Sequence, residues 1–212
     1  MAVFTFPAET RFYSRCLSDL AFPRASTVAE LGSGDGTAVI AALRDHPDVT
    51  VSGIERDPVS AQAAKQAIAS AGITGYHVAC GDFMLHRPPG RMLVANPPYM
   101  PSCPDAPEDV APMLAQCDGG PTGGEASIAL LGLGYEDVML LVAGHADPMA
   151  VLSAPRGAGY EVAGWLARPF GFGALHPPVM NVLRGLANGP GILHRVVVCP
   201  GRSSVEARRP GW

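Results

Sequence analysis

The sequence predicts an α/β domain with a doubly wound, mostly parallel sheet. Short β-branched runs alternate with alanine-rich helical runs, which is the pattern of a parallel sheet covered by helices on both faces. Hydrophobic residues make up 48% of the chain and charged residues only 16%, which favours a globular core over disorder. Because 212 residues are enough for one well-buried domain, we expect residues 1–212 to form a single domain.

The first half of the chain predicts three helices and four strands. Apolar residues of the first segment share one helical face, a strand then leads into a glycine-rich turn, and a helix leaves that turn. Asp57 and Pro58 predict the start of the third helix, since aspartate caps helices and proline fits their first turn. The expected helices are residues 8–21, 37–45 and 58–71, and the expected strands are residues 27–31, 49–55, 76–80 and 91–95.

The second half predicts three more strands, at residues 138–144, 160–168 and 193–199, which brings the total to seven. Proline and glycine gather between residues 97 and 124 and again between residues 169 and 191. Loops of this length are usually functional or mobile, so we expect both to wall a substrate pocket. The final residues, 201–212, are expected to fray.

Charge and cysteine content exclude several classes of function. The net charge is -4, and Lys65 is the only lysine among 15 basic residues, so no basic stripe follows a nucleic acid backbone and such a substrate is disfavoured. The five cysteines form no close pairs, which predicts reduced thiols, no metal site and a cytoplasmic location. A signal peptide is not expected, because residues 1–7 lack a basic stretch followed by a long apolar run, and a membrane span is not expected, because Glu136 and Asp137 interrupt the most apolar later region.

A glycine-rich turn follows the first expected strand, with the sequence Glu30-Leu31-Gly32-Ser33-Gly34-Asp35-Gly36. Residues without a β-carbon let the backbone bend sharply and lie against a ligand. The dinucleotide fingerprint would need a glycine where this chain has Thr37, so a pyrophosphate site is the weaker interpretation. The turn suits the methionine tail of S-adenosylmethionine. The backbone N–H groups of the turn can hold the carboxylate of that tail, while Glu30 faces its ammonium or sulfonium group.

Two further carboxylates stand at the ends of the next strands. Glu55 ends the second strand, where a carboxylate can accept both hydroxyls of a ribose. Asp82 follows the third strand, where it can accept from an adenine amino group with Phe83 as a flat neighbour. Each acid alone could be a helix cap or a solvated strand end, but three acids on successive strands predict one extended nucleoside site.

The fourth expected strand leads into the sequence Asn96-Pro97-Pro98-Tyr99. The side-chain carbonyl of Asn96 and the backbone carbonyl of Pro97 can accept both hydrogens of a planar amide or amine, and Tyr99 can stack on its plane. Such contacts orient a nitrogen toward an electrophilic methyl group without a strong base. We therefore predict that Asn96, Pro97 and Tyr99 form the catalytic site and that Asn96 also borders the cofactor. His145 and His176 are weaker candidates for polar contacts.

These motifs together resemble those of the class I S-adenosylmethionine-dependent methyltransferases. The resemblance implies a Rossmann-like fold over about residues 8–200, with a seven-stranded sheet that contains one antiparallel strand. It implies that the cofactor contacts include Glu30, Gly32, Gly34, Glu55 and Asp82, and we predict that Ser33, Phe83 and Asn96 complete the cofactor site. Within the class the chain is most similar to the HemK-type protein-glutamine N-methyltransferases, through Ala8-Glu9-Thr10, Asn96 to Pro101 and the glycine-rich residues 118–123. It departs from them in residues 102–117, which have no clear counterpart, and in the proline-rich residues 169–190, which are unlike a flat protein-docking surface.

The predicted function is therefore S-adenosylmethionine-dependent methylation of an amide or amine nitrogen on a small molecule or peptide. Two alternatives remain open: methylation of a release-factor glutamine, and a non-methylating reaction such as cyclisation of the methionine moiety. A binding protein with a degenerate site is disfavoured, because Glu55, Asp82 and Asn96 are all present. The sequence leaves the acceptor and the oligomeric state open.

Overall fold

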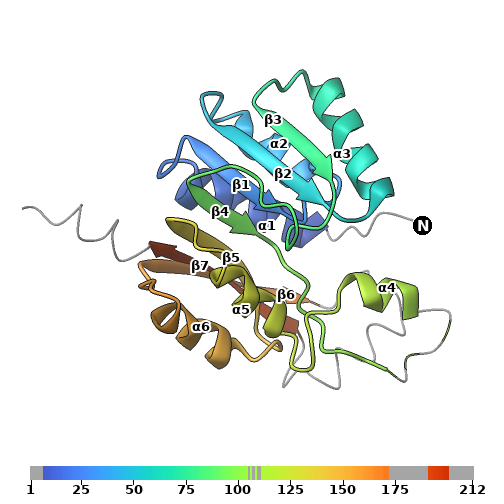
Figure 1. Cartoon of the computed structure of the whole chain (residues 1–212), viewed down its shortest axis with the longest axis vertical. Coiled ribbons are helices and arrows are strands. Elements are labelled where there is room, and N and C mark those ends of the chain that lie inside the picture. Colours follow the sequence, from blue (N-terminus) through green and yellow to red (C-terminus); the bar gives the residue numbers. More distant parts are fainter. Residues whose placement is uncertain (1–6, 105, 107, 109–110, 172–190, 201–212) are drawn as a thin grey trace, which may run out of the picture. The chain divides into compact units, whose positions relative to one another are not determined.

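The computed structural model describes residues 7–104, 106, 108, 111–171 and 191–200 (Figure 1). The described chain divides into two compact units, which we treat separately. The first unit contains the residues up to Asn96 together with Tyr135–Met139, and the second contains Pro97–Gly134 and Leu140–Cys199. The residues that were predicted to bind the cofactor therefore all fall in the first unit.

The first unit is built on a parallel sheet. Its strands follow the order β3-β2-β1-β4, in which β1 pairs in parallel with both β2 and β4, and β2 pairs in parallel with β3. All four residues of β4 are buried, and apolar runs of this kind are typical of parallel strands covered on both faces. The strands are β1 (Thr27–Leu31), β2 (Thr50–Glu55), β3 (Tyr76–Cys80) and β4 (Met92–Ala95).

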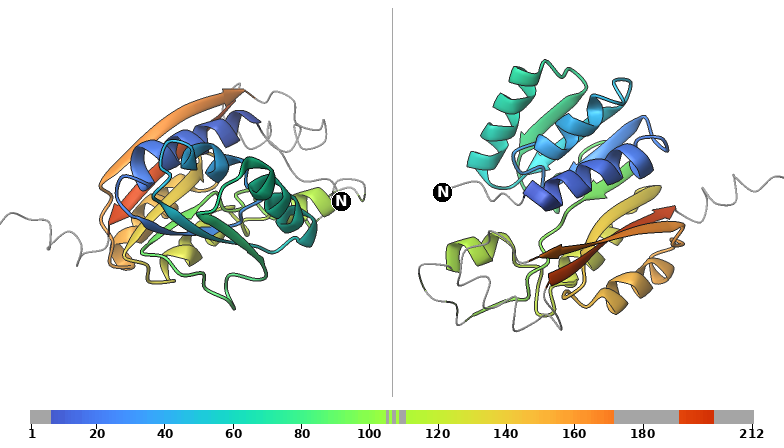
Figure 2. Two further views of the ribbon diagram at one scale, coloured as in Figure 1. Left: turned by 90° about the horizontal axis from the view of Figure 1, so that it is seen from above. Right: turned by 180° about the vertical axis from the view of Figure 1, so that it is seen from behind.

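Three helices lie side by side on one face of this sheet (Figure 2). They are α1 (Pro7–Cys16), which continues as the π-helical turn η1 (Leu17–Ala21), α2 (Thr37–Leu43) and α3 (Pro58–Ala71). The sequence explains both ends of α3: Asp57 Oδ2 accepts from the Ser60 N–H at 2.8 Å, and Gly72 ends the helix in the left-handed region with φ 67°.

The second unit combines the remainder of β5 with an antiparallel pair of strands, β6 and β7, in the order β5-β7-β6. Two of its helices, α5 and α6, pack against each other. Asp147 begins α6 by accepting from the Ala150 N–H at 3.1 Å. The elements are α4 (Ala111–Gln116), α5 (Glu125–Leu131), β5 (Asp137–Ala143), α6 (Pro148–Gly157), β6 (Gly164–Gly171) and β7 (Gly191–Pro200).

The α/β class with a parallel sheet is confirmed, and the strands expected at residues 27–31 and 76–80 have the predicted bounds. The strand expected at residues 160–168 was placed too early: the Tyr160 N–H bonds to the Pro155 carbonyl at 2.8 Å in the turn that ends α6, so β6 begins only at Gly164. Helix α4 lies inside a segment that we expected to be a loop.

Some expectations cannot be compared with the structure. Most of the second proline-rich segment and the C-terminal residues 201–212 lie outside the described residues. The single domain and the seven strands in one sheet stay predictions. Among the described helices, none has the length and apolar character needed to cross a membrane.

Candidate functional site

The strand register of the first unit brings the predicted cofactor residues to one edge of its sheet. Leu31 is in register with Ile54 of β2 and with Ala95 of β4, and Glu55 is in register with Cys80 of β3. The next residues along these strands therefore lie side by side at the carboxyl edge, where ligands bind in open α/β sheets. Along this edge the order is Asp82, Glu55, the glycine turn and Asn96.

The glycine turn has the backbone geometry that the sequence predicted. Gly32, Gly34 and Gly36 have φ values of 73°, 55° and 76°, in the left-handed region that residues with a β-carbon rarely adopt. A β-carbon added to Gly32 or Gly34 would meet no atom within 4 Å, so space is open beside this turn. The turn therefore presents accessible backbone to a ligand.

Glu55 connects the glycine turn with the start of α3. Its Oε2 accepts from the Gly34 N–H and its Oε1 accepts from the Asp57 N–H, both at 2.8 Å. Each carboxylate oxygen has two lone pairs, so each can accept one further hydrogen bond. The half-buried Glu55 side chain is thus held in place and can still bind two hydroxyl groups.

Glu30 lies in a buried polar cluster rather than at the open surface of the edge. It is 2% exposed and accepts a hydrogen bond from the Tyr76 hydroxyl. Burial raises the pKa of Glu30 to about 7, although the Tyr76 hydrogen bond acts in the opposite direction. Burial and the nearby Glu30 charge also raise the pKa of Tyr13, whose buried hydroxyl has no hydrogen-bond partner among the described residues. The Ser33 hydroxyl lies beside Glu30 and, like the Tyr76 hydroxyl, acts to lower the pKa of Glu30.

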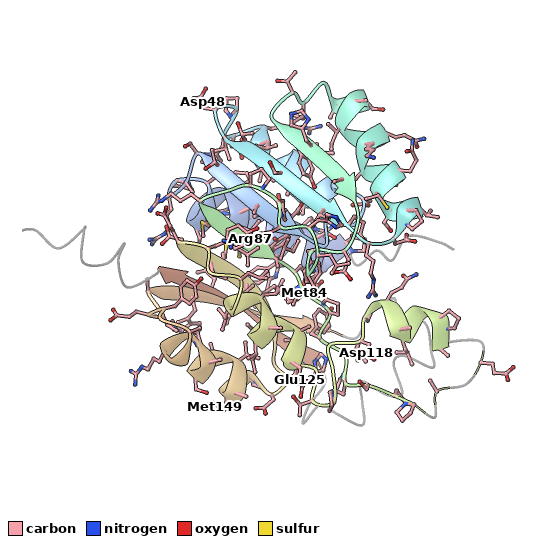
Figure 3. All side chains as sticks on the ribbon, viewed as in Figure 1. Asp48, Met84, Arg87, Asp118, Glu125 and Met149 are labelled. Carbon is pink, nitrogen blue, oxygen red and sulfur yellow. The ribbon has the colours of Figure 1, made fainter. Side chains whose placement is uncertain are left out.

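Asp82 and Phe83 follow β3 in a short turn. Asp82 Oδ1 accepts from the Met84 N–H at 2.8 Å, and its backbone carbonyl accepts from the N–H groups of Leu85 and His86. Phe83 is half-buried, while Met84 is exposed (Figure 3). The second carboxylate oxygen of Asp82 lies at the β3 end, where an adenine contact was predicted.

Asn96, the last residue of the first unit, has a side chain with two different ends. Its Nδ2 donates to Glu9 Oε1 of α1 at 2.6 Å, across 87 residues of sequence. Its Oδ1 is buried and has no hydrogen-bond partner among the described residues. An unsatisfied buried carbonyl costs about 1–3 kcal/mol, so this oxygen is a candidate for binding a donor that is absent from the free protein.

Pro97 and Tyr99 belong to the second unit, where a glycine-rich turn supports their loop. The Met100 N–H donates to the Cys117 carbonyl and the Gly119 N–H donates to the Met100 carbonyl, both at 2.8 Å. A β-carbon on Gly119 would lie 2.6 Å from the Pro98 carbonyl oxygen, so only glycine permits this close approach. Residues 118–123, which resemble a glycine-rich stretch of the HemK-type enzymes, thus pack against the loop that contains Pro97 and Tyr99.

Side chains fix the shape of this supporting turn. Asp118 Oδ1 accepts from Ser102 Oγ and from the Gly120 N–H, each at 2.8 Å, and Glu125 accepts from the Thr122 N–H and hydroxyl (Figure 3). The Tyr99 ring meets the His145 ring edge-on, with centroids 5.6 Å apart. His145 therefore lies beside Tyr99, which was predicted to stack on the methyl acceptor, whereas His176 is outside the described residues.

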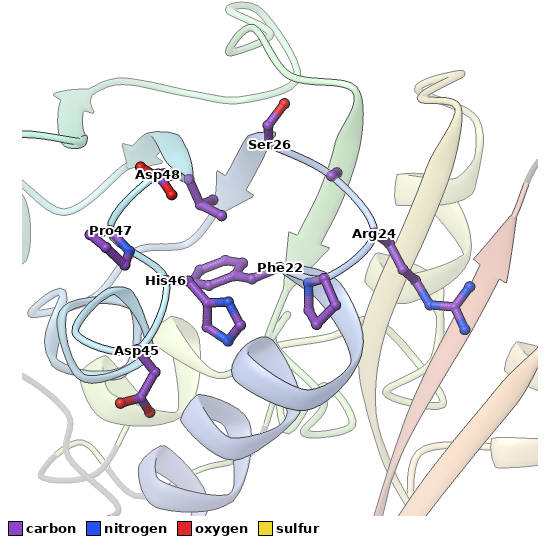
Figure 4. A pocket seen from close by; sticks show the side chains of 10 residues that line it. Phe22, Arg24, Ser26, Asp45, His46, Pro47 and Asp48 are labelled. Atoms are coloured by element: carbon purple, nitrogen blue, oxygen red, sulfur yellow. The ribbon is translucent and has the colours of Figure 1, made fainter.

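A cavity of about 390 Å³ also lies in the first unit, between the segments that precede β1 and β2 (Figure 4). Its walls include Phe22 and His46, whose rings meet edge-on at 5.7 Å. Because these segments enter the strands, the cavity is at the amino edge of the sheet, opposite the predicted cofactor residues. It holds none of the residues to which the sequence assigned chemistry.

Sequence reasoning missed the polar partners Glu9 and Tyr76. Tyr76 looked like an ordinary strand residue, and Glu9 was noted only as part of a resemblance. The available signal for Glu9 was an acid in the first turn of a helix with one apolar face. Within the described part of the chain, no three His, Cys, Asp or Glu side chains gather to hold a metal ion.

Comparison with known proteins finds no matching family model and no matching curated protein sequence. Solved structures do match in fold. M. jannaschii TYW2, solved in complex with AdoMet, is 8% identical with a TM-score of 0.60, over 93% of this chain and 78% of its own. The [4+2]-cyclase SpnF is 12% identical with a TM-score of 0.57, over 89% and 81%.

EvdMO1 is 17% identical with a TM-score of 0.57, over 97% of this chain, but this chain spans only 45% of the length of EvdMO1. At these identities the likeness establishes a shared fold.

Proposed function

We propose that this protein is an S-adenosylmethionine-dependent methyltransferase that acts on nitrogen. The observation that carries the proposal is the order of groups along the carboxyl edge of the first sheet: Asp82, Glu55, the glycine turn and Asn96. The same order would suit the adenine, ribose and methionine parts of the cofactor, followed by a methyl acceptor.

The residues present fit this cofactor. Glu55 retains lone pairs for two ribose hydroxyls, and the open side of Gly32 and Gly34 can admit a methionine tail. Ser33, which is buried beside Glu30, and Asp82 with Phe83 complete the set. When bound, the cofactor supplies an electrophilic methyl group on a positively charged sulfur, and the buried Glu30 carboxylate favours positive charge nearby.

Asn96 is proposed to hold the acceptor nitrogen. Its buried Oδ1 can accept one N–H, and the backbone carbonyl of Pro97, the next residue, can accept a second. Tyr99 is proposed to stack on the acceptor plane. Accepting both N–H groups would orient the nitrogen lone pair, so orientation and electrostatics would lower the barrier without a general base. The methylated nitrogen would then lose one proton to water.

The acceptor class is proposed to be a small molecule or a peptide. The net charge of -4 and the scattered arginines argue against a nucleic acid. A release-factor glutamine remains the protein alternative, supported by the Asn96 to Pro101 motif. A non-methylating reaction on the cofactor is the second class of function, and the structural likeness to a cyclase keeps it in view.

The finer description of the fold belongs to the same proposal. We propose one doubly wound, seven-stranded sheet in a single domain, and a cytoplasmic protein. The order β3-β2-β1-β4 in the first unit and the order β5-β7-β6 in the second support the sheet, since β5 contributes residues to both units.

The test separates binding from transfer. The wild-type protein and Asn96→Ala are titrated with S-adenosylmethionine by calorimetry, then incubated with it and with candidate amines, amides and glutamine peptides. We expect nearly equal cofactor affinity in the two proteins and, in Asn96→Ala, turnover lower by about 10² or more. Chromatography identifies the product: S-adenosylhomocysteine supports methyl transfer, whereas methylthioadenosine formed without any acceptor would reject it. A larger thermal shift with NAD than with S-adenosylhomocysteine would reject the cofactor.

A further inference from the structure

Glu9 and Asn96 form a contact that fixes which end of the Asn96 amide is free. Glu9 is the third residue of α1 and only 3% exposed, and its Oε1 lies 2.6 Å from Asn96 Nδ2. Three buried residues hold α1 in the first unit: Phe12, Tyr13 and Cys16. The carboxylate therefore approaches Asn96 from a rigid element.

An ionised carboxylate can only accept hydrogen bonds, whereas an amide can both donate and accept. Glu9 can thus bind the NH₂ end of Asn96 but not its carbonyl end. Because the two ends of the amide diverge from one carbon atom, this contact turns Oδ1 away from Glu9. The result is the observed asymmetry, with a bonded Nδ2 and a buried Oδ1 that has no partner in the described part of the chain.

An ionised Glu9 side chain would have a second effect. Hydrogen bonds to ionised groups are shorter and about twice as strong as neutral ones, and hydrogen bonds in a chain polarise one another. Donation from Nδ2 to a carboxylate raises the electron density on Oδ1. Oδ1 is thereby a better acceptor for an N–H group than the carbonyl of an isolated amide.

We propose that Glu9 is a positioning residue that locks the Asn96 amide with its carbonyl toward the methyl acceptor. This inference rests on the proposed function. It also narrows the substrate class. The site selects acceptors that present an N–H donor, such as primary amides and amines, and it rejects an acceptor atom that carries no hydrogen, whether that atom is an oxygen or a ring nitrogen. A flipped Asn96 would have the opposite preference.

A purely structural role for Glu9 is the competing explanation, because acids in the first turn stabilise helices. Glutamine at the same position keeps the size of the side chain and can also serve in a helix cap. Glutamine can, however, bond either end of the Asn96 amide. Glu9→Gln therefore preserves the helix and removes the lock, and Glu161→Gln, at an exposed position, is the matched control for loss of one charge.

The first experiment observes the contact without any ligand. In ¹⁵N-labelled protein the side-chain NH₂ signals of Asn96 are assigned by their loss in Asn96→Ala. We expect one of the two protons to resonate downfield of the other side-chain amides, and both signals to move in Glu9→Gln while the remaining spectrum stays in place. Unmoved Asn96 signals in Glu9→Gln, or an equal movement in Glu161→Gln, would overturn the proposal.

The second experiment measures turnover with N-acetylglutaminamide and S-adenosylmethionine. We expect Glu9→Gln to lower kcat about tenfold with the cofactor affinity unchanged, and Glu9→Gln/Asn96→Ala to lose no more than Asn96→Ala alone. Additive losses would mean that Glu9 does not act through Asn96. If the wild-type protein forms no S-adenosylhomocysteine, the proposed function fails with this acceptor, and the NMR result still decides the role of Glu9.

Discussion

Replacing Glu30 with glutamine is expected to stabilise the protein at neutral pH and to flatten the pH dependence of its unfolding free energy. The carboxyl group is buried, and its pKa in the folded protein is raised from the ordinary 4.5 to about 7. The folded state therefore holds this proton more tightly than the unfolded chain does. Its contribution to stability is complete below pH 4.5 and is lost as the pH rises through 7.

The size of this effect follows from the difference between the two pKa values. One pKa unit corresponds to about 1.4 kcal/mol, so ionisation of Glu30 lowers the unfolding free energy by at most roughly 3.5 kcal/mol. Glutamine preserves an acceptor for the Tyr76 hydroxyl and carries no charge at any pH.

The assay is urea unfolding of the wild-type protein, Glu30→Gln and the exposed control Glu161→Gln across this pH range. We expect the curves of the wild-type protein and Glu161→Gln to fall together as the pH rises, while the curve of Glu30→Gln stays flatter. Parallel curves for all three proteins would refute the assignment of a raised pKa to Glu30.

Three further substitutions test other parts of the structure. Glu55→Ala removes up to two hydrogen bonds to the proposed ribose and should weaken S-adenosylmethionine binding about tenfold or more by calorimetry, so unchanged affinity would remove that assignment. Gly119→Ala places a β-carbon 2.6 Å from the Pro98 carbonyl oxygen and should cost roughly 1–3 kcal/mol in urea unfolding, whereas Gly157→Ala, which meets no atom within 4 Å, should not destabilise. Leu141→Ala, at a fully buried position, should lower the unfolding free energy by roughly 2–5 kcal/mol in the same measurement. A smaller loss would indicate that neighbouring side chains move into the space left by the leucine.

Local sequence signals predicted the helices and strands of the first unit well. The cap at Asp57, the proline that follows it and the β-branched strands each depend on neighbouring residues, and the structure contains them in the predicted places. Helix α4 escaped prediction because its proline-containing sequence lies in a proline-rich region, although proline fits the first turn of a helix. The π-helical turn η1 has no local signature of this kind.

The predicted site residues at the carboxyl edge could be placed because strand order and strand ends can be inferred from the alternating pattern. The bond between Glu9 and Asn96 could not, because it joins residues 87 positions apart and depends on how α1 packs. The hydrogen bond between Tyr76 and Glu30 depends in the same way on the pairing of β2 with its neighbours. Tertiary contacts of this kind leave little trace in a single sequence.

The double engagement of Glu55 changes how its substitution should be interpreted. The carboxylate accepts hydrogen bonds from the backbone N–H groups of Gly34 and Asp57 in the free protein, so it orders these two residues before any ligand binds. Truncation to alanine would release both backbone groups, and part of any loss in affinity would be the entropy of re-ordering them. Amide hydrogen exchange at Gly34 and Asp57 in the free protein would measure that part directly. The affinity lost in Glu55→Ala should therefore be interpreted together with the order of these two residues before the ligand binds.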